Sequence, residues 1–481
     1  MNGRNVAIIS LVLAACGALC AAAEGLVDAG EPFGELPLVD EVLCGGPVEE
    51  GRPFAEGPGQ PSRVETILGA PCRVLPAEGE AKFFAYRLGR GKGLKAGAPY
   101  VLSIEFPDDR PRTMFLMNRG AEMSHGVYTG AALGDTLYGY TNNNAESLAI
   151  PLSGKMQTWK TLFFLHDRFP DLAQPRGEGD RPHTPEDGFW VIVAQAEQTR
   201  APLSAGAAVA RIRLFAVPDP AKFHVRLRLP PQPLPRRRLF WREEMADGVI
   251  GSRNEQQRGL KNETDWFEFK ARLMQFLGLD TFCKDLLEFG HNQGWGCPEG
   301  PSGQDWYYQS KTPQRWAQIL EMLRPYGFDV LPYYEYAGGT GAKGLGRQKR
   351  CITLGGGNTY THITWSEKFN LDVTDPESLG DAKKLLDFTI VRHKDVARFV
   401  GAWFRTRPSN MPMSFSDDCL LLFSDHARRL EPVTREELKR DPRLLEEYRA
   451  WWFQRRRDFL VALRDHLRAS ASPDAVILFT P

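Results

Sequence analysis

The sequence predicts a multidomain chain in which an antiparallel β-sandwich, jelly-roll-like, precedes a (β/α) domain of TIM-barrel type. Short apolar or alternating segments separated by turn residues fill the first half of the chain, which is typical of a sandwich. In the second half, single apolar strands alternate with helical segments, which is typical of a parallel α/β fold. The length of 481 residues also exceeds that of one typical domain.

The composition is that of an ordinary globular protein, with 42% hydrophobic and 25% charged residues, so the chain can bury sizeable cores. Lys+Arg and Asp+Glu each total 60, and the pI is about 7.1. A nucleic-acid-binding domain usually carries a strong basic excess, so we expect no nucleic-acid partner. The arginine runs at 236–238 and 455–457 are interpreted as a solvated linker and a solvated helix face.

Residues 1–23 resemble a signal peptide, in which Arg4 precedes an apolar run and three alanines offer a cleavage site before Glu24. The apolar run is shorter than the ~20 residues plus flanks of a comfortable membrane span. An alternative is a lipoprotein-type cleavage box that ends at Cys16, which would place a lipid anchor there. Either interpretation predicts a secreted or periplasmic protein, and no later segment is apolar enough to span a membrane.

Two of the eight cysteines lie in the predicted signal peptide, and the others are Cys44, Cys72, Cys283, Cys297, Cys351 and Cys419. None has the close CxxC spacing of a zinc site, so we expect no metal site and no cofactor. An oxidising compartment would permit a Cys44–Cys72 disulfide. Small buried thiols are the alternative, and the sequence leaves both open.

Residues 24–218 form the predicted sandwich. By analogy, a β-sandwich that precedes a larger domain in a secreted protein is often a carbohydrate-binding or spacer module. The strand-like segments of the predicted sandwich include residues 82–88, 100–106, 161–166, 189–194 and 208–217. The aromatic residues Tyr128, Tyr138, Tyr140 and Trp159 either line a sugar platform or pack in the core. Residues 219–237 are rich in proline and predict a stiff linker.

Residues 238–481 form the predicted (β/α) domain. Its strands are expected at 239–245, 281–289, 328–336, 399–405 and 475–480. Helix starts are expected at Asp265 with Glu268, at Thr312, at Asp375, at Thr434 and at Asp441. An open doubly wound sheet and a barrel both fit this alternation. Long loops rich in aromatic and charged residues, and a first loop without a phosphate-binding fingerprint, favour the barrel.

The predicted barrel is incomplete. A complete barrel has ~8 strands in ~250 residues or more, whereas this half of the chain offers about five βα units. We therefore expect a shortened version of a longer chain, truncated after the fifth strand.

Polar and aromatic residues follow the predicted strands at ends that would converge on one face. The candidate catalytic carboxylates are Glu244, Glu335 and Asp417. The candidate substrate-binding residues are Arg405, His291, Asn292, Trp295, Trp306, Tyr307 and Tyr334. Paired carboxylates perform glycoside hydrolysis, and aromatic rings stack on sugars. The structural alternatives stay open, because a strand-end Glu often pairs with a cation and Asp417 or Asp418 can cap the adjacent helix.

The segments FVGAWFRTRP, SFSDDCLLLFSDHARR and YRAWWFQRRRDFLVALRDHL carry a resemblance. They resemble the fourth-strand region, the following loop and the long helix of glycoside-hydrolase-type TIM barrels of bacterial secreted proteins, broadly the clan that includes family 42 β-galactosidases. The resemblance implies a retaining or inverting glycosidase with two carboxylates, one of them a Glu after Asn at the end of the fourth strand. This sequence has Arg405 there and no Asn-Glu.

Two functions therefore follow from the sequence. The first is a secreted glycoside hydrolase-like protein that acts on a poly- or oligosaccharide by a two-carboxylate mechanism. The second is a non-catalytic carbohydrate-binding surface protein on an incomplete or degenerate barrel. An open-sheet enzyme that uses a nucleotide is disfavoured by the missing glycine fingerprint.

Overall fold

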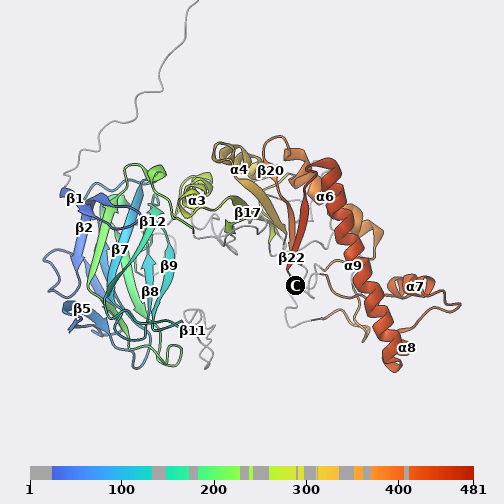
Figure 1. Cartoon of the computed structure of the whole chain (residues 1–481), viewed down its shortest axis with the longest axis horizontal. Coiled ribbons are helices and arrows are strands. Elements are labelled where there is room, and N and C mark those ends of the chain that lie inside the picture. The colour runs from blue at the N-terminus through green and yellow to red at the C-terminus, as the bar shows by residue number, and fades with distance from the viewer. Residues whose placement is uncertain are drawn as a thin grey trace, which may run out of the picture. The chain divides into compact units, whose positions relative to one another are not determined.

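The computed structural model describes residues 24–132, 148–172, 182–227, 238–241, 259–288, 291–296, 310, 312–334, 351–360, 370–405 and 411–480. The chain consists of two compact units. Unit 1 comprises Met1–Phe223 and Ser252–Lys261, and unit 2 comprises His224–Gly251 and Asn262–Pro481. Figure 1 shows the strands of unit 1 and the mixed strands and helices of unit 2.

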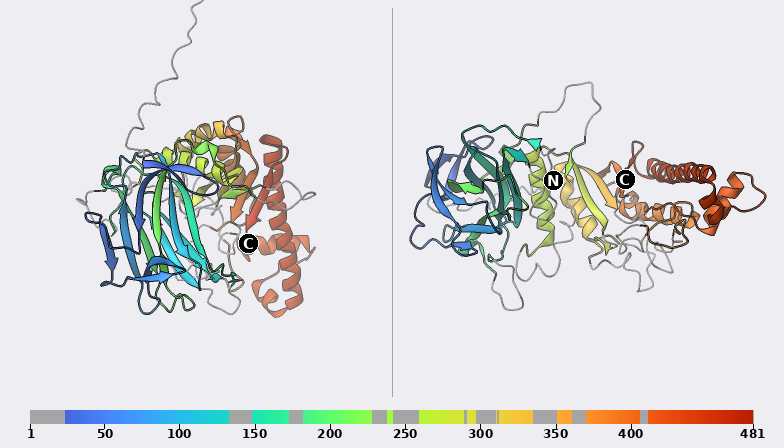
Figure 2. Two further views of the ribbon diagram at one scale, coloured as in Figure 1. Left: turned by 60° about the vertical axis from the view of Figure 1, so that its left-hand side comes forward. Right: turned by 90° about the horizontal axis from the view of Figure 1, so that it is seen from below.

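Unit 1 is a β-sandwich, as the sequence predicts. One antiparallel sheet has the order β1 (Glu24–Asp28), β2 (Glu35–Leu43), β15 (Arg211–Ala216), β7 (Pro99–Pro107) and β12 (Met156–Phe164). The other has the order β3 (Phe54–Gly57), β6 (Lys82–Leu88), β13 (Phe189–Gln195), β8 (Arg112–Asn118) and β9 (Met123–Thr129). Figure 2 shows these strands from two further directions.

Shorter elements complete the description of unit 1. A three-stranded sheet has the order β14 (Ala207–Val209), β5 (Ala70–Leu75) and β4 (Arg63–Ile67), and β10 (Ala131–Ala132) pairs with β11 (Leu148–Ala149). Two 3-10 turns are η1 (Pro185–Asp187) and η2 (Pro220–Lys222). The segment expected at 82–88 coincides with β6, whereas the single strand expected at 208–217 divides at Ala210 into β14 and β15.

The sandwich core lies between the two five-stranded sheets. Alternate residues of β13, Phe189, Val191 and Val193, pack in it against Leu102 and Ile104 of β7. Because successive side chains of a strand point to opposite faces, this alternation is what the period of two in the sequence predicts.

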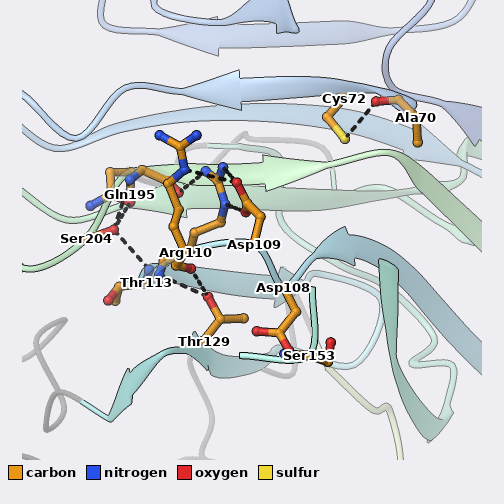
Figure 3. A network of polar contacts seen from close by, with 12 residues as sticks. Ala70, Cys72, Asp108, Asp109, Arg110, Thr113, Thr129, Ser153, Gln195 and Ser204 are labelled. Carbon is orange, nitrogen blue, oxygen red and sulfur yellow. Dashed lines mark hydrogen bonds and ion pairs between the residues drawn. The ribbon is translucent and has the colours of Figure 1, made fainter. Parts of the chain in front are cut away.

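Polar contacts fix the turn between β7 and β8 (Figure 3). The buried Arg112 guanidinium donates to both carboxylate oxygens of Asp109, at 2.8 and 3.1 Å, and to the carbonyl of Gly206 at 3.0 Å. The Ser204 hydroxyl accepts the Thr113 N–H at 2.9 Å (Figure 3). A buried guanidinium is stabilised where a carboxylate pairs with it in this two-pronged geometry.

Cys44 and Cys72 are both free, buried thiols. Cys44 lies in the core between the two large sheets, whereas Cys72 packs in a separate cluster with Ile67, Val74 and Ala208. Each thiol donates to a carbonyl two residues earlier in its own segment, and Figure 3 shows this contact for Cys72. Of the two alternatives that the sequence leaves open, the structure has the buried thiols.

Unit 2 is built on a parallel sheet whose strands lie side by side in chain order. The order is β16 (Phe240–Trp241), β17 (Thr281–Glu288), β19 (Asp329–Tyr334), β21 (Gly401–Arg405) and β22 (Val476–Thr480). Two short strands flank it: β18 (His291–Asn292) pairs antiparallel with β17, and β20 (Arg398–Phe399) pairs parallel with β19. A described strand coincides with each of the five predicted apolar runs, and the run expected at 399–405 divides into β20 and β21. For the run expected at 239–245, only Phe240–Trp241 is seen as a strand, because residues 242–245 lie outside the described part of the chain.

The helices of unit 2 follow their strands. They are α3 (Glu263–Leu277), α4 (Arg315–Leu323), α6 (Pro376–Thr389), α7 (Asp417–His426), α8 (Arg435–Arg440) and α9 (Pro442–Ser470), with the 3-10 turns η3 (Arg324–Tyr326) and η4 (Val391–His393). The predicted caps Asp375, Thr434 and Asp441 are confirmed, because each side chain accepts a backbone N–H in the first turn.

Two of the predicted helix starts are wrong. Asn262, not Asp265, caps α3, since its side chain accepts the N–H of Thr264. The helix expected to begin at Thr312 begins at Arg315. For α3, a capping pattern in sequence does not show which of several nearby polar residues has the extended backbone that a cap needs. Gln314, which precedes α4, has helical backbone angles and makes no side-chain cap hydrogen bond.

The main helices pack on one face of the parallel sheet. A single apolar cluster joins residues of α3, α4, α6 and α9 to Phe282 and Leu286 of β17, Val330 of β19, and Ala402 and Phe404 of β21. A doubly wound sheet would have helices on both faces. Among the described residues, these helices cover one face only, which is the arrangement that a (β/α) barrel has.

The other face of the sheet is concave. Phe240 of β16 and Trp403 of β21 meet edge to face with ring centroids 5.4 Å apart, although β17 and β19 lie between their strands. Neighbouring strands are about 4.8 Å apart, so a flat sheet would separate these two backbones by about 14 Å. The two rings meet because the sheet curves toward them, and we call their side of the sheet the concave face.

A closed barrel is not seen among the described residues, and the expected incomplete barrel of about five βα units stays a prediction. The parallel strands of the described residues make an open sheet in which β16 and β22 are the two ends, and no pairing of described strands closes it. Within the ranges described, no helix is long and apolar enough to cross a membrane.

Candidate functional site

The concave face carries a row of functional side chains from three neighbouring strands. Asp285 of β17 lies opposite Tyr333 of β19 in the strand register, and Tyr333 lies opposite Trp403 of β21. Partners in one register row point to the same face of a sheet. The row therefore presents a carboxylate, a phenol and an indole side by side on the concave face.

The two aromatic rings of this row are in direct contact. The centroids of Tyr333 and Trp403 are 4.8 Å apart and the ring planes are inclined by 73°, an edge-to-face arrangement. Asp285 is 2% exposed and Tyr333 is 1% exposed. Trp403 is half-buried and its neighbour Phe240 is 37% exposed, so the row runs from two buried side chains on β17 and β19 to a solvent-accessible end at Trp403.

Arg405 extends the site by one step along β21. It is two residues beyond Trp403 and on the same face, at the carboxyl end of the strand, and it is 7% exposed. Sequence reasoning selected Arg405 as a substrate-binding residue, and the structure brings it onto the face that also holds Asp285 and Tyr333.

A β-bulge follows Asp285 and is stabilised by Trp295, one of the predicted substrate-binding residues. The register shifts between Asp285 and Leu287, and the carbonyl of Leu286 accepts the N–H of Gln293 at 3.1 Å and the indole N–H of Trp295 at 2.9 Å. Bulges re-aim side chains next to functional sites. Trp295 therefore supports the backbone beside Asp285.

Trp295 and Asn292 are core residues rather than surfaces for a ligand. The ring of Trp295 is 1% exposed and stacks on Phe388, with centroids 6.4 Å apart. The Asn292 side chain accepts the N–H groups of Gly294 and Trp295 and donates to the carbonyl of Trp295. The expected stacking of Trp295 on a sugar is corrected on this ground, because its ring packs against α6 in the helix-covered apolar cluster and not on the concave face.

Tyr334 also differs from the expectation. Its hydroxyl lies 2.6 Å from the hydroxyl oxygen of Thr389 in α6, and its ring stacks on Phe404 on the side that the helices cover. Burial raises the pKa of the Tyr334 phenol far above its usual value. Its neighbour Tyr333 lies on the concave face instead, because adjacent residues of a strand point to opposite faces.

Asp417 lies in the first turn of α7 and not in the row. Its carboxylate pairs with Arg435 at 2.9 Å, and its side chain is 87% exposed. The residue that caps α7 is Ser416, whose hydroxyl accepts the N–H of Cys419, so neither Asp417 nor Asp418 is the cap.

Other expected site residues lie outside the described part of the chain. They are Glu244, Trp306, Tyr307 and Glu335. His291 belongs to β18, where its backbone pairs with Glu288, and only its backbone is described. The assignments of these five residues stay predictions.

Sequence reasoning missed Asp285 and Trp403. Both lie inside apolar runs that are typical of buried strands, whereas the predicted site residues mostly follow the ends of such runs. Both residues can be identified from the alternation of side chains along each strand, once the helix-covered face of that strand is known.

The aromatic residues expected to form a sugar platform on the sandwich have other surroundings. Trp159 of β12 faces the sandwich core, where its ring lies 5.2 Å from that of His125. Tyr128 of β9 is half-buried and packs near Phe115 and Ala201. Tyr138 and Tyr140 lie outside the described residues.

Two further features bear on the site. Among the described residues, no group of three or more His, Cys, Asp or Glu side chains is placed to hold a metal ion. A cavity of about 360 Å³, lined by residues that include Arg398, Phe399 and Pro473, lies at the amino-terminal ends of β20 and β22. In parallel α/β folds the chemistry lies at the carboxyl ends, so this cavity is at the opposite end from Arg405.

No protein-family model and no curated protein sequence matches the chain. Among solved structures, the chain is similar to a carbohydrate-binding module of Cellvibrio mixtus lichenase 5A in complex with cellotriose, with 10% identity, a TM-score of 0.19, and 37% of this chain and 98% of that chain covered. It is similar to the family 11 carbohydrate-binding module of a Clostridium thermocellum cellulosomal cellulase, with 10% identity, a TM-score of 0.21, and 37% and 96% covered. It is also similar to the CBM22-1–GH10 modules of Clostridium thermocellum xylanase 10B, with 8% identity, a TM-score of 0.19, and 88% and 66% covered. At these TM-scores the similarities carry no argument about function.

Proposed function

We propose that this chain is a carbohydrate-binding protein whose ligand site is the concave face of the parallel sheet in unit 2. The observation that supports the proposal is the register row of Asp285, Tyr333 and Trp403. A sugar ring has apolar C–H faces that pack on aromatic rings, and hydroxyl groups that hydrogen-bond to carboxylates. One row of this sheet offers both kinds of partner.

The test is saccharide binding to the full chain, measured on a glycan array and then by calorimetry on the best ligand. Trp403→Leu removes the indole face and Asp285→Asn removes the charge, and each is expected to weaken binding at least tenfold. Tyr334→Phe is the matched control, since its hydroxyl is bonded to Thr389 on the helix-covered side. Binding that is equal in all three variants would contradict the proposal, provided that their melting curves show folded protein.

The second candidate function is glycoside hydrolysis by unit 2 as a barrel of the kind related to family 42 β-galactosidases. Strands in chain order with helices on one face favour this candidate. In this mechanism, one carboxyl group acts as the general acid and a second acts as the general base or nucleophile. The candidates are Glu244, Glu335 and Asp417. Retaining chemistry requires carboxyl groups ~5 Å apart, and inverting chemistry requires ~6.5–9.5 Å.

A release assay for reducing ends separates the two candidates. Hydrolysis of a bound saccharide that is lost in Glu335→Gln, with binding retained, supports the glycosidase. Binding without any release of reducing ends supports the carbohydrate-binding protein. The resemblance of residues 1–23 to a signal peptide predicts that either function is performed outside the cytoplasm, and amino-terminal sequencing of the mature protein tests that prediction.

A further inference from the structure

The cavity of about 360 Å³ at the amino-terminal ends of β20 and β22 has the size of a small-molecule site. Its lining comes from residues 394–399, which lead into β20, and from residues 471–473, which follow α9. Lys394 joins the two segments, because its ammonium group donates to the carbonyl of Ser470 at 3.2 Å. This contact also places a positive charge at the negative end of the α9 helix dipole.

Two cations of the lining keep hydrogen-bond donors for a ligand. Lys394 uses one of its three N–H groups on Ser470. The Nε–H of Arg398 donates to Asp329, and the Arg398 side chain is 65% exposed. Among the described residues, none accepts a hydrogen bond from the two Nη groups of Arg398. Because Asp329 is 1% exposed and fixes the Nε side, the guanidinium is oriented before any ligand binds.

The charges around the cavity leave a positive excess. Asp329 pairs with two arginines, Arg398 and Arg238. Asp395 is the one carboxylate of the cavity lining, and it forms no ion pair with any side chain in the described part of the chain. Three cations, Lys394 included, therefore face two carboxylates.

From these contacts we infer that the cavity binds a small organic anion, a phosphate or carboxylate group on a body of about the size of a monosaccharide. Arg398 and Lys394 bind the anionic group. The apolar part of the lining, which includes Val396, Phe399 and Pro473, contacts the body of the ligand. The inference does not depend on the site proposed on the concave face, because the cavity lies at the opposite end of the strands from Arg405.

Three probes of similar size test the inference on the full chain by calorimetry: glucose 6-phosphate, gluconate and glucose. At least one of the two anions is expected to bind about tenfold more tightly than glucose, because hydrogen bonds between charged groups are the strong ones. This advantage should shrink as the salt concentration rises. The anion that binds more tightly distinguishes a phosphate site from a carboxylate site. Failure of both anions to bind more tightly than glucose would overturn the inference.

Variants then assign the binding of the tighter anion to the cavity. Lys394→Gln is expected to weaken it severalfold, whereas Asp395→Asn should strengthen it because a repelling charge is removed. Arg392→Gln is the matched control, since it makes the same charge change at a guanidinium that lies over the ring of Phe388 and outside the lining. Anion binding that is unchanged in Lys394→Gln and Asp395→Asn, with melting curves that show folded protein, would overturn the inference. An equal loss in Arg392→Gln and Lys394→Gln would do so too.

Discussion

Tyr333 and Trp403, from neighbouring parallel strands, meet edge to face with ring centroids 4.8 Å apart on the concave face of the sheet. This contact joins β19 to β21 in the register row that also contains Asp285 of β17. Phe240 of β16 adds a third ring, 5.4 Å from Trp403. The curvature of the sheet therefore brings aromatic side chains from three strands together.

The Tyr333–Trp403 contact is expected to stabilise unit 2. In a double-mutant cycle of Tyr333→Leu and Trp403→Leu, the coupling free energy should be about 0.5–1.5 kcal/mol in favour of the pair. Urea unfolding of the four proteins measures it. The same cycle on Tyr326 and Phe328, whose rings stack near the start of β19, serves as a comparison. A coupling near zero at Tyr333 and Trp403 would show that the contact is absent in solution.

Tyr334→Phe is expected to lower the free energy of unfolding by about 1 kcal/mol, because the hydroxyl loses its bond to Thr389 in the buried helix interface. Saccharide binding should not change. The adjacent variant Tyr333→Phe makes the same chemical change on the opposite face and is the matched control. If Tyr334→Phe weakened binding more than Tyr333→Phe did, the assignment of faces would be reversed.

Trp295→Phe is expected to weaken saccharide binding although Trp295 offers no face to a ligand. The variant keeps a ring against Phe388 but removes the indole N–H that donates to Leu286 in the bulge beside Asp285. We expect a loss of about 1 kcal/mol of stability and a severalfold loss of affinity. Calorimetry and urea unfolding measure the two effects. An unchanged affinity would mean that the bulge does not position Asp285.

Unit 1 should lose stability on acidification through Asp109. Burial acts to raise the pKa of Asp109, but its hydrogen bonds and ion pair with Arg112 outweigh burial and hold that pKa below the usual value. A carboxylate with a depressed folded-state pKa contributes stability that is complete above its unfolded pKa, about 3.9, and is lost as the pH falls through the folded value.

The measurement is urea unfolding of the wild type and of Asp109→Asn between pH 7 and pH 2. The variant should be less stable near neutral pH, and its stability should fall less steeply below about pH 4. Arg110→Ala, which removes an exposed arginine that also contacts Asp109, controls for the surface charge. Parallel curves for the wild type and Asp109→Asn would contradict the prediction.

Cys44 and Cys72 should resist alkylation in the folded protein. Burial raises the pKa of Cys72 to about 11 and raises that of Cys44 further, so almost no reactive thiolate is present at pH 8. After unfolding in urea without a reductant, both should react with iodoacetamide, as peptide mass spectrometry will show. Labelling that requires prior reduction would reveal a disulfide instead of two free thiols.

The sequence by itself determined the classes and boundaries of many elements. Alternating apolar residues predicted β6 and β13 closely, and apolar runs predicted β17 and β19, because burial on one face or on both imposes these patterns. Asp375 and Asp441, each followed by proline, gave the starts of α6 and α9, since capping is a local interaction. Arg405, selected from the sequence as a substrate-binding residue, lies on the face that carries the proposed site, and its role stays a prediction.

Only the tertiary structure decided which residues share that face. Tyr333 and Tyr334 are adjacent and chemically identical, and they were separated by the position of α6, whose Thr389 binds the second hydroxyl. Asp285 and Trp403 belong to strands more than a hundred residues apart and meet in one row because the register of β19 aligns them. No local pattern contains this information, because the face of a strand is defined by the helices that pack on it, and strand register is a relation between distant segments.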